Sequence, residues 1–288
     1  MRIDSHQHFW QLQRGDYGWL TPELEPLYRD FLPPDLEPML KAADVQHTIL
    51  VQAATTVAET DYLLRLAAEH AFIAGVVGWV DMDDVETALS DLNRLQANPY
   101  LLGIRPMIQD IADPDWMLRD SLTPIFETLI ELNLRFDALV LPAHLENLRT
   151  LLHRHPQLQC VIDHAAKPAI ADASWQPWAD DMAALAQETN SYCKFSGLLT
   201  EAGDRTDDDA LQPYTAHLLQ SFGAQRLMWG SDWPVLTLAG DYAGWLQQSE
   251  RLLQHLPEAE RAAIFGATAA AFYGLNSRAP QLPTEGDH

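Results

Sequence analysis

Four side chains of the sequence have types and a spacing that suit proton transfer or metal binding. His6 and His8 are separated by one residue, so in a β-strand both imidazoles lie on the same face. His164 and Asp232 stand just beyond apolar runs, where a polar side chain is costly unless it is paired or functional. Three imidazoles and a carboxylate can hold a water molecule for proton transfer, and they can equally bind one metal ion. We therefore take these four residues as the candidate catalytic set, and as the ligands if a metal is bound.

Further residues near the predicted strand ends could contact a substrate. Arg105 offers a fixed cation and several donors to a carbonyl or carboxylate, although it could instead pair with a structural acid. Lys167 is one of three lysines in the chain, and an ordinary loop lysine is its alternative. Gln52 and Trp79 are as well suited to packing as to binding, and the same holds for Asp81 and Asp137.

Positioning these residues requires elements that bring strand ends together. Short apolar runs alternate with amphipathic helical segments, which predicts strands near residues 2–8, 47–54, 73–80, 101–106, 134–140, 158–164, 191–197 and 226–231. Several runs are almost wholly apolar, as is typical of strands buried on both faces of a parallel sheet. Eight strands, each followed by a helix, predict a (β/α)8 TIM barrel with its active site at the carboxyl ends of the strands. A doubly wound open sheet is the alternative, but no glycine-rich phosphate-binding motif follows a strand.

The domain organisation follows from the same pattern. Residues 1–276 are predicted to form one barrel, and the polar, proline-rich residues 277–288 a flexible tail. Predicted helices cover residues 60–70 and 144–155, and a long final helix covers 257–274. In a further predicted helix, Thr123 is the N-cap and Pro124 the first helical residue. The long connection 9–38 carries Trp10, which could lie against a sugar ring as part of a lid or could pack within the loop.

Composition excludes several classes of function. The 288 residues include 41 acidic and 18 basic side chains, a formal charge of −23, which argues against binding to nucleic acid or anionic lipid. The sequence has no apolar run of about 18 residues and no signal-peptide pattern at its start, so we expect a cytoplasmic protein. Cys160 and Cys193 lack metal-site spacing and are expected to be free and buried.

Three motifs resemble a known family. DSHQHFW at the start, DHAAKP in the middle and MWGSDWPV near the end are similar to the amidohydrolase superfamily. More narrowly they resemble its sugar-lactonase branch, with L-fuconolactonases, L-rhamnonolactonases and pyrone-dicarboxylate lactonases, as do VVGWVD, LGIRPMIQD and CKFSGLLTEA. The resemblance covers about residues 2–275.

The resemblance implies a (β/α)8 hydrolase in which His6, His8, His164 and Asp232 are the site residues. It also implies that hydrolysis needs no metal, although one Zn²⁺ can occupy the site. Arg105 stands where binuclear relatives have a bridging lysine, and the fifth strand run LRFDALV contains no histidine. Both differences argue against a binuclear enzyme.

The predicted function is hydrolysis of a sugar lactone to the aldonic acid in carbohydrate catabolism. Asp232 would take a proton from water, and Arg105 would polarise the carbonyl. The expected partner is the small-molecule lactone alone, with the chain as a monomer or small homo-oligomer. A metal-dependent decarboxylase of the same superfamily and a non-catalytic binding barrel are the alternatives.

Overall fold

Eight parallel strands form one sheet in the order β1 to β8 in the computed structural model, which describes residues 1–275. The strands are β1 (Ile3–Gln7), β2 (His47–Val51), β3 (Ile73–Gly78), β4 (Leu101–Ile104), β5 (Arg135–Ala138), β6 (Cys160–Ile162), β7 (Tyr192–Phe195) and β8 (Leu227–Trp229). The segment after β8 returns to β1, where the Asp232 amide donates to the His6 carbonyl and the His8 amide to the Trp233 carbonyl. The sheet thus nearly closes on itself, which confirms the predicted (β/α)8 barrel and excludes the open sheet.

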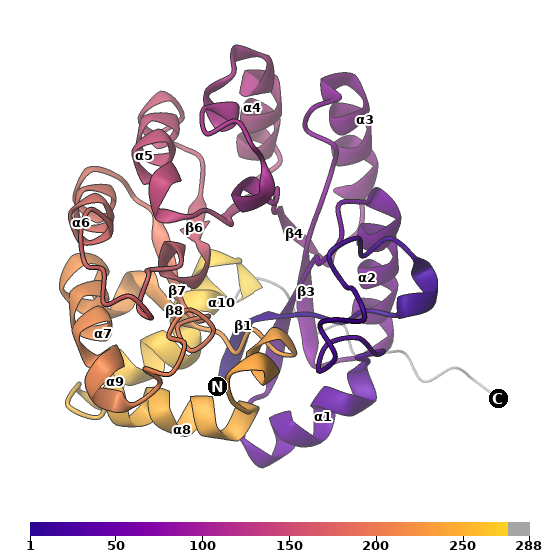
Figure 1. The fold of residues 1–288 in the computed structure, drawn as a ribbon. Helices are drawn as coiled ribbons and strands as arrows, with labels where there is room; N and C mark the ends of the chain where they lie inside the picture. Colours follow the sequence, from indigo (N-terminus) through magenta and orange to yellow (C-terminus); the bar gives the residue numbers. More distant parts are fainter. Residues whose placement is uncertain (276–288) are drawn as a thin grey trace.

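Helices surround the strands in a ring (Figure 1). They are α1 (Pro33–Ala42), α2 (Val57–Glu69), α3 (Val85–Leu95), α4 (Thr123–Glu131), α5 (Leu145–Arg154), α6 (Trp178–Glu188), α7 (Asp208–Phe222), α8 (Tyr242–Leu252), α9 (Glu258–Ala262) and α10 (Thr268–Phe272). Short 3₁₀ turns occupy Leu12–Arg14, Ile108–Asp110, Trp116–Leu118, Asp120–Leu122, Pro142–His144, Asp163–Ala166, Ala224–Arg226 and Val235–Leu238. Among the described residues, no helix is long and apolar enough to span a membrane.

Two details of the predicted helices were wrong. Thr123 does not cap α4: it is the first helical residue, Pro124 is the second, and Leu122 precedes them without a side-chain cap. The final helix is interrupted by a π-helical segment, Ala263–Ala267, between α9 and α10. At Gly266 a Cβ would lie 2.3 Å from the Met1 carbonyl oxygen, so this close approach to the start of the chain accompanies the break. The predicted tail at 277–288 lies outside the described residues.

The apolar core consists of two clusters, one inside the barrel and one around it. Alternate strand residues such as Ile49, Val51 and Val77 fill the barrel interior, and they pack against Phe272 and Tyr273 at the end of the chain. A second, larger apolar cluster lies between the strands and the surrounding helices. Both cysteines are free and buried, as predicted. Apolar side chains thus fill much of the amino end of the barrel, while His6, His164 and Asp232 lie toward the carboxyl ends of their strands.

Candidate active site

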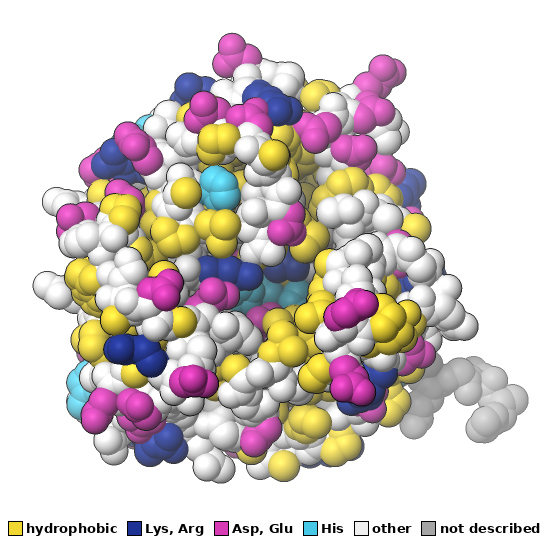
Figure 2. Space-filling view, viewed as in Figure 1, with side chains coloured by type: hydrophobic (Ala, Val, Ile, Leu, Met, Phe, Trp, Pro, Cys, Tyr) yellow, Lys and Arg dark blue, Asp and Glu magenta, His cyan; other side chains and the backbone are white. Residues whose placement is uncertain are grey.

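The face shown in Figure 2 is hollowed near its centre, with histidine side chains at the floor and Lys or Arg side chains beside it. His6 lies in β1 and His8 directly beyond it, while Arg105, His164 and Asp232 follow β4, β6 and β8. All five are at least 95% buried. Parallel strands place their carboxyl ends at one end of a barrel, which is why residues so far apart in the sequence meet there.

The structure brings the four predicted catalytic residues into one cluster. The Nε2 atoms of His6 and His8 are 3.2 Å apart. The Oδ1 atom of Asp232 lies 3.3 Å from His8 Nε2, 3.7 Å from His6 Nε2 and 3.8 Å from His164 Nε2. One carboxylate oxygen therefore faces three imidazoles, which is an arrangement that can hold and deprotonate a water molecule.

Two of these side chains stand on backbone that ordinary residues rarely adopt. Residues 164–167 have φ values between 51° and 57°, and Asp232 has φ 58°. Each left-handed residue other than glycine costs about 1–2 kcal/mol, so the surrounding contacts must hold it in place. The Asp232 amide donates to the His6 carbonyl, and the Trp178 indole donates to the Ala165 carbonyl. Strain retained at these positions is typical of functional sites.

His164 is further located by the strand beside it. Its Nδ1 lies 2.9 Å from Ser196 Oγ, just beyond β7. The next residue, Gly197, has φ 66°, and a Cβ there would lie 2.7 Å from the His164 ring atoms Cγ and Nδ1. Gly197 is thus needed both for its backbone conformation and for the close approach of the imidazole.

Asp4 holds the segment that carries Asp232. Its carboxylate accepts hydrogen bonds from the Ser231 hydroxyl (2.6 Å) and amide (2.8 Å). It also accepts bonds from the His6 amide and the Tyr242 hydroxyl. Burial raises the pKa of Asp4 to about 6, against the lowering effect of these hydrogen bonds. Asp4 therefore ties the strand that carries His6 to the turn that carries Asp232.

Arg105 lies beside the cluster and is held by two neighbours. Its guanidinium donates to the side-chain and main-chain oxygens of Gln52. The NH1 atom lies 3.4 Å from both Asp163 Oδ2 and His6 Nε2. Gln52 is fully buried and its amide also donates to the Ala54 carbonyl, so it positions Arg105. The structural acid that the sequence left open for Arg105 is Asp163.

The side chains of Trp79 and Lys167 form no hydrogen bond with the four catalytic candidates, although the charge of Lys167 acts on His164. Trp79 lines a separate cavity of about 220 Å³ at the ends of β3 and β4, where Asp81, Asp110 and Trp116 also contribute. Lys167 Nζ lies 3.9 Å from a Glu201 carboxylate oxygen, with its side chain about a quarter exposed.

The structure corrects the prediction that Trp10 contacts the substrate. Its side chain is fully buried, and the indole donates to the Arg29 carbonyl. It packs against Trp19 and Phe31, with ring centroids 5.3 and 5.2 Å apart. A ring enclosed in this way has no face for a sugar, so packing within the loop is its observed role.

Sequence reasoning overlooked a charged network beneath His6. Lys194 of β7 is fully buried, and its Nζ lies 2.5 Å from Asp137 Oδ2, 3.0 Å from Asp163 Oδ1 and 3.0 Å from His6 Nδ1. The Tyr273 hydroxyl donates to Asp137 at 2.8 Å. The signal was present: a lysine within the apolar run YCKF must find partners, because a buried charge is costly alone.

Burial sets the ionisation of the cluster. It lowers the pKa of His164 to about 4, and with the charge of Lys194 it lowers the pKa of His6 well below its usual value. Burial alone would raise the pKa of Asp232, but His164, His8 and His6 together outweigh it and lower that pKa. At neutral pH the site therefore presents a carboxylate facing neutral His6 and His164 rings.

The side chains of the cluster also carry the types of donor atom that bind metal ions. Nitrogen and oxygen atoms of His6, His8 and Asp232 lie within 4.8 Å of one another, as do those of His6, Asp163 and His164. Imidazole and carboxylate are ligands that Zn²⁺ accepts. The predicted ligand set of His6, His8, His164 and Asp232 is thus chemically suitable for one such ion.

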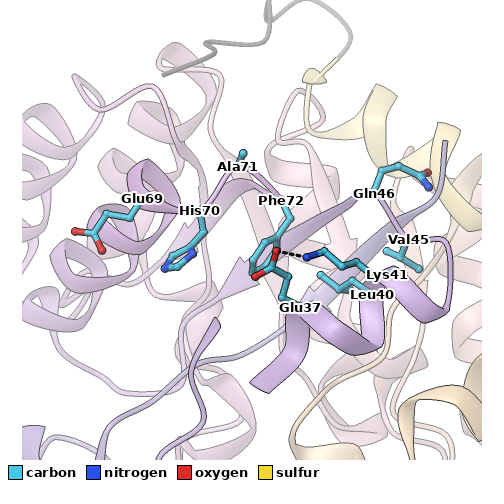
Figure 3. Close-up of a pocket in the computed structure, with 9 residues that line it drawn as sticks. All are labelled: Glu37, Leu40, Lys41, Val45, Gln46, Glu69, His70, Ala71 and Phe72. Atoms are coloured by element: carbon cyan, nitrogen blue, oxygen red, sulfur yellow. Dashed lines mark ion pairs between the residues drawn. The ribbon is translucent and has the colours of Figure 1, made fainter. Parts of the chain in front are cut away.

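A larger cavity of about 330 Å³ lies elsewhere (Figure 3). It is formed by α1 and by the segments leading into β2 and β3, at the amino ends of these strands. Its charged side chains include the ion pair of Lys41 and Glu37 at 2.9 Å. Its lining includes none of the predicted site residues, so the carboxyl end of the barrel is the candidate site.

Comparison with known proteins gives close and extensive matches. The amidohydrolase family model matches residues 3–275. The chain is 45% identical over 280 residues to an L-fucono-1,5-lactonase from Burkholderia ambifaria, covering 96% of both chains. It is 37% identical to an L-fucono-1,5-lactonase from Burkholderia multivorans, again over 96% of each chain.

A solved structure agrees in fold. An amidohydrolase from Burkholderia multivorans with bound zinc has a TM-score of 0.89 and 36% identity, covering 95% of this chain and 99% of that one. The family match spans the barrel and all four predicted catalytic residues. The chain belongs to the amidohydrolase family.

Proposed function

We propose that this protein hydrolyses a sugar lactone of the L-fucono-1,5-lactone class, with Asp232 as the base that activates water. The observation that carries the proposal is the Asp232 oxygen that faces three imidazoles within 3.8 Å at the floor of the barrel mouth. The likeness to two L-fucono-1,5-lactonases bears out the prediction of a sugar-lactone hydrolase.

The reaction starts with a water molecule held among His6, His8 and Asp232. The ionised carboxylate takes the proton as the water oxygen attacks the lactone carbonyl carbon. Arg105 lies 3.4 Å from His6 Nε2, so its cation stabilises the negative charge that develops on the carbonyl oxygen. When the ring opens, Asp232 returns the proton to the departing ring oxygen.

A bound Zn²⁺ would be held by His6, His8, His164 and Asp232, and would supply a positive charge that makes water more acidic. The proton transfers described above are those of the protein's own side chains. General acid–base assistance of this kind gives on the order of 10²–10⁴-fold acceleration, which is useful for an ester as reactive as a lactone.

A separate cavity at the ends of β3 and β4 offers groups that suit a neutral, hydroxyl-rich ligand. The cavity beside β3 and β4 is lined by Asp81, Asp83 and Asp110 together with Trp79 and Trp116. Carboxylates accept hydrogen bonds from sugar hydroxyls, and indole faces suit the C–H side of a sugar ring. The decarboxylase alternative has less support, because the curated relatives at 45% and 37% identity are lactonases.

A pH-indicator assay of the purified protein against a panel of lactones tests the proposal. The panel contains L-fucono-, L-rhamnono-, D-galactono- and D-arabinono-lactones, each measured with and without a chelator. Acid release from one or two neutral sugar lactones supports the proposal. Inactivity on every lactone, under both conditions and after addition of zinc, would refute it. The catabolic role and an assembly no larger than a small homo-oligomer remain parts of the proposal.

A further inference from the structure

We propose that Glu59 is a positioning residue for the hydrolysis, which holds the turn after β2 so that Gln52 aims Arg105 at the lactone carbonyl. Glu59 lies in the first turn of α2 and is fully buried. Its carboxylate bonds to the main chain of the turn, so it acts on Arg105 through that turn. This role of Glu59 rests on the proposed function, in which Arg105 stabilises the charge on the carbonyl oxygen.

The turn after β2 has two main-chain amides that, among the described residues, bond to Glu59 alone. Ala53 N lies 3.1 and 3.0 Å from the two carboxylate oxygens of Glu59, and Ala54 N lies 2.7 Å from Oε2. Ala53 and Ala54 are at most 3% exposed, so solvent has little access to their amides. A buried amide that loses its acceptor is costly, and the chain moves to avoid that cost. The carboxylate therefore determines the conformation of the turn.

The place of Glu59 in α2 shows that this contact is not ordinary helix capping. Thr56 is the N-cap of α2, and its side chain accepts a hydrogen bond from the Glu59 amide at 3.1 Å. An acid three residues after such a cap commonly reaches back to the amide of the cap residue. Here the carboxylate bonds instead to Ala53 and Ala54, which precede Thr56 in the chain. Its contacts thus serve the turn.

Gln52 connects the turn to Arg105. Its side-chain amide donates to the Ala54 carbonyl at 3.1 Å. Its side-chain oxygen accepts from Arg105 NH2 at 2.7 Å and from Nε at 3.1 Å, and its main-chain carbonyl also accepts from NH2. A displacement of Ala53 and Ala54 therefore displaces both oxygens that hold the guanidinium. Because Arg105 NH1 lies 3.4 Å from His6 Nε2, the cation then moves relative to the cluster.

The long connection after β1 holds the same turn by other groups, where it lies against the start of α2 (Figure 1). The Trp19 indole donates to the Ala53 carbonyl at 2.7 Å, and the Thr56 hydroxyl donates to Asp16 Oδ2 at 2.9 Å. Neither bond uses the Glu59 carboxylate, so both can persist when Glu59 is replaced. We therefore expect the turn of a Glu59 variant to shift and not to unfold.

The ionised carboxylate is the form that suits two amide donors. Burial raises the pKa of Glu59 to about 7, and the hydrogen bonds from the Ala54 and Ala53 amides oppose this change. An ionised carboxylate only accepts hydrogen bonds, whereas an amide side chain also donates them. Glu59→Gln keeps the shape of the side chain and replaces one acceptor oxygen by an NH₂ group that faces the turn. Near pH 8 the substitution thus removes an acceptor with little change in volume.

The signal of the Arg105 Nε–H group in a ¹H–¹⁵N NMR spectrum of the full chain tests the positioning directly, near pH 8 and without substrate. It is identified as the signal that is lost in Arg105→Lys. Because Nε donates to Gln52, the signal should shift in Glu59→Gln. An Arg105 signal that stays in place in a folded Glu59→Gln protein would overturn the proposal.

Thr268→Val is the matched control for the loss of a buried hydrogen bond. Thr268 is buried in α10, and its hydroxyl donates at 3.0 Å to the Ala224 carbonyl, which precedes β8 and so lies toward the amino end of the barrel. Valine keeps its shape and removes that bond. This variant should lower Tm, as Glu59→Gln does, and leave the Arg105 signal unchanged. A shift of equal size in both variants would show a general loosening of the fold and contradict the proposal.

Kinetics on the best lactone of the panel supply the second readout. Arg105 acts on charge that develops in the transition state, so Glu59→Gln should lower kcat on the order of 10-fold and leave KM nearly unchanged. Thr268→Val should keep both constants. A wild-type kcat in Glu59→Gln, or a change confined to KM, would overturn the proposal.

A second variant covers a folding failure of Glu59→Gln. Glu59→Asp keeps the negative charge and withdraws the carboxylate from the turn by one methylene group. It should shift the same Arg105 signal and lower kcat, and a folded Glu59→Asp protein with both unchanged would contradict the proposal. If the wild type hydrolyses no lactone, the proposed function fails. The NMR comparison still decides whether Glu59 positions Arg105.

Discussion

Replacing Gly197 by alanine should inactivate the site while leaving the fold intact. The new Cβ would lie 2.7 Å from His164 ring atoms, whereas ordinary contacts lie between 3.4 and 4 Å. Relief requires a shift of roughly 0.7 Å or more in the imidazole or in the backbone beside it. Misplacement of a catalytic group by about 1 Å can cost on the order of 10²-fold in rate. We therefore expect kcat/KM to fall by about 10²-fold.

The stability cost of the same substitution can be separated from the catalytic one. Alanine at φ 66° costs about 1–2 kcal/mol, and the collision with His164 adds to this. Gly15→Ala is a matched control, because Gly15 has the left-handed φ of 72° and a Cβ there meets no described atom within 4 Å. The control should lose a similar amount of backbone stability and keep its full kcat/KM.

The assay combines initial rates on the best lactone of the panel with thermal unfolding of all three proteins. The reasoning predicts a small loss of Tm in both variants and a large loss of kcat/KM in Gly197→Ala alone. A Gly197→Ala enzyme with wild-type kcat/KM would refute the placement of His164 in the catalytic cluster. Equal losses of activity in both variants would show that backbone strain, and not the displaced imidazole, is responsible.

Three further predictions concern pH, positioning and the thiols. For His164, the folded-state pKa of about 4 lies below the unfolded value of 6.5, so the unfolded chain binds more protons between these values. The neutral His164 ring thus contributes about 3 kcal/mol to the free energy of unfolding above pH 6.5, and this contribution is lost as the pH falls to 4. Urea unfolding from pH 4 to 7 should show a wild-type advantage over His164→Asn that grows with pH, and a constant difference would contradict the assignment. Asp4→Asn removes an acceptor from Ser231 and should lower both Tm and kcat/KM, the latter at least 10-fold; unchanged kinetics would show that Asp4 does not position Asp232. Cys160 and Cys193 are buried with raised thiol pKa values, so maleimide should modify them only after unfolding; rapid labelling of the native protein would be inconsistent with that burial.

The fold and the centre of the site were predictable because they depend on local pattern. Apolar runs such as HTILVQAA require burial on both faces of a sheet. This pattern predicted the approximate positions of all eight strands. The barrel rule then placed His6, His164 and Asp232 together, since each stands at the carboxyl end of a strand.

The features that the sequence did not predict depend on contacts between distant segments of the chain. Lys194 joins three neighbouring strands only when β5, β6 and β7 are side by side, and spacing within one strand does not show this. Trp10 illustrates the same difficulty, because a loop aromatic has the same sequence appearance whether it binds a sugar or packs inward. The break at Gly266 depends on Met1, at the other end of the chain.

Hydrolysis of L-fucono-1,5-lactone by the wild type and by Asp232→Asn tests the central claim most directly. Asparagine keeps the shape of the side chain but removes its ability to accept a proton at the carboxylate. The account predicts acid release by the wild type and a loss of at least about 10²-fold in kcat for the variant, with unchanged thermal unfolding. An Asp232→Asn protein that is folded and retains most of the activity would contradict it.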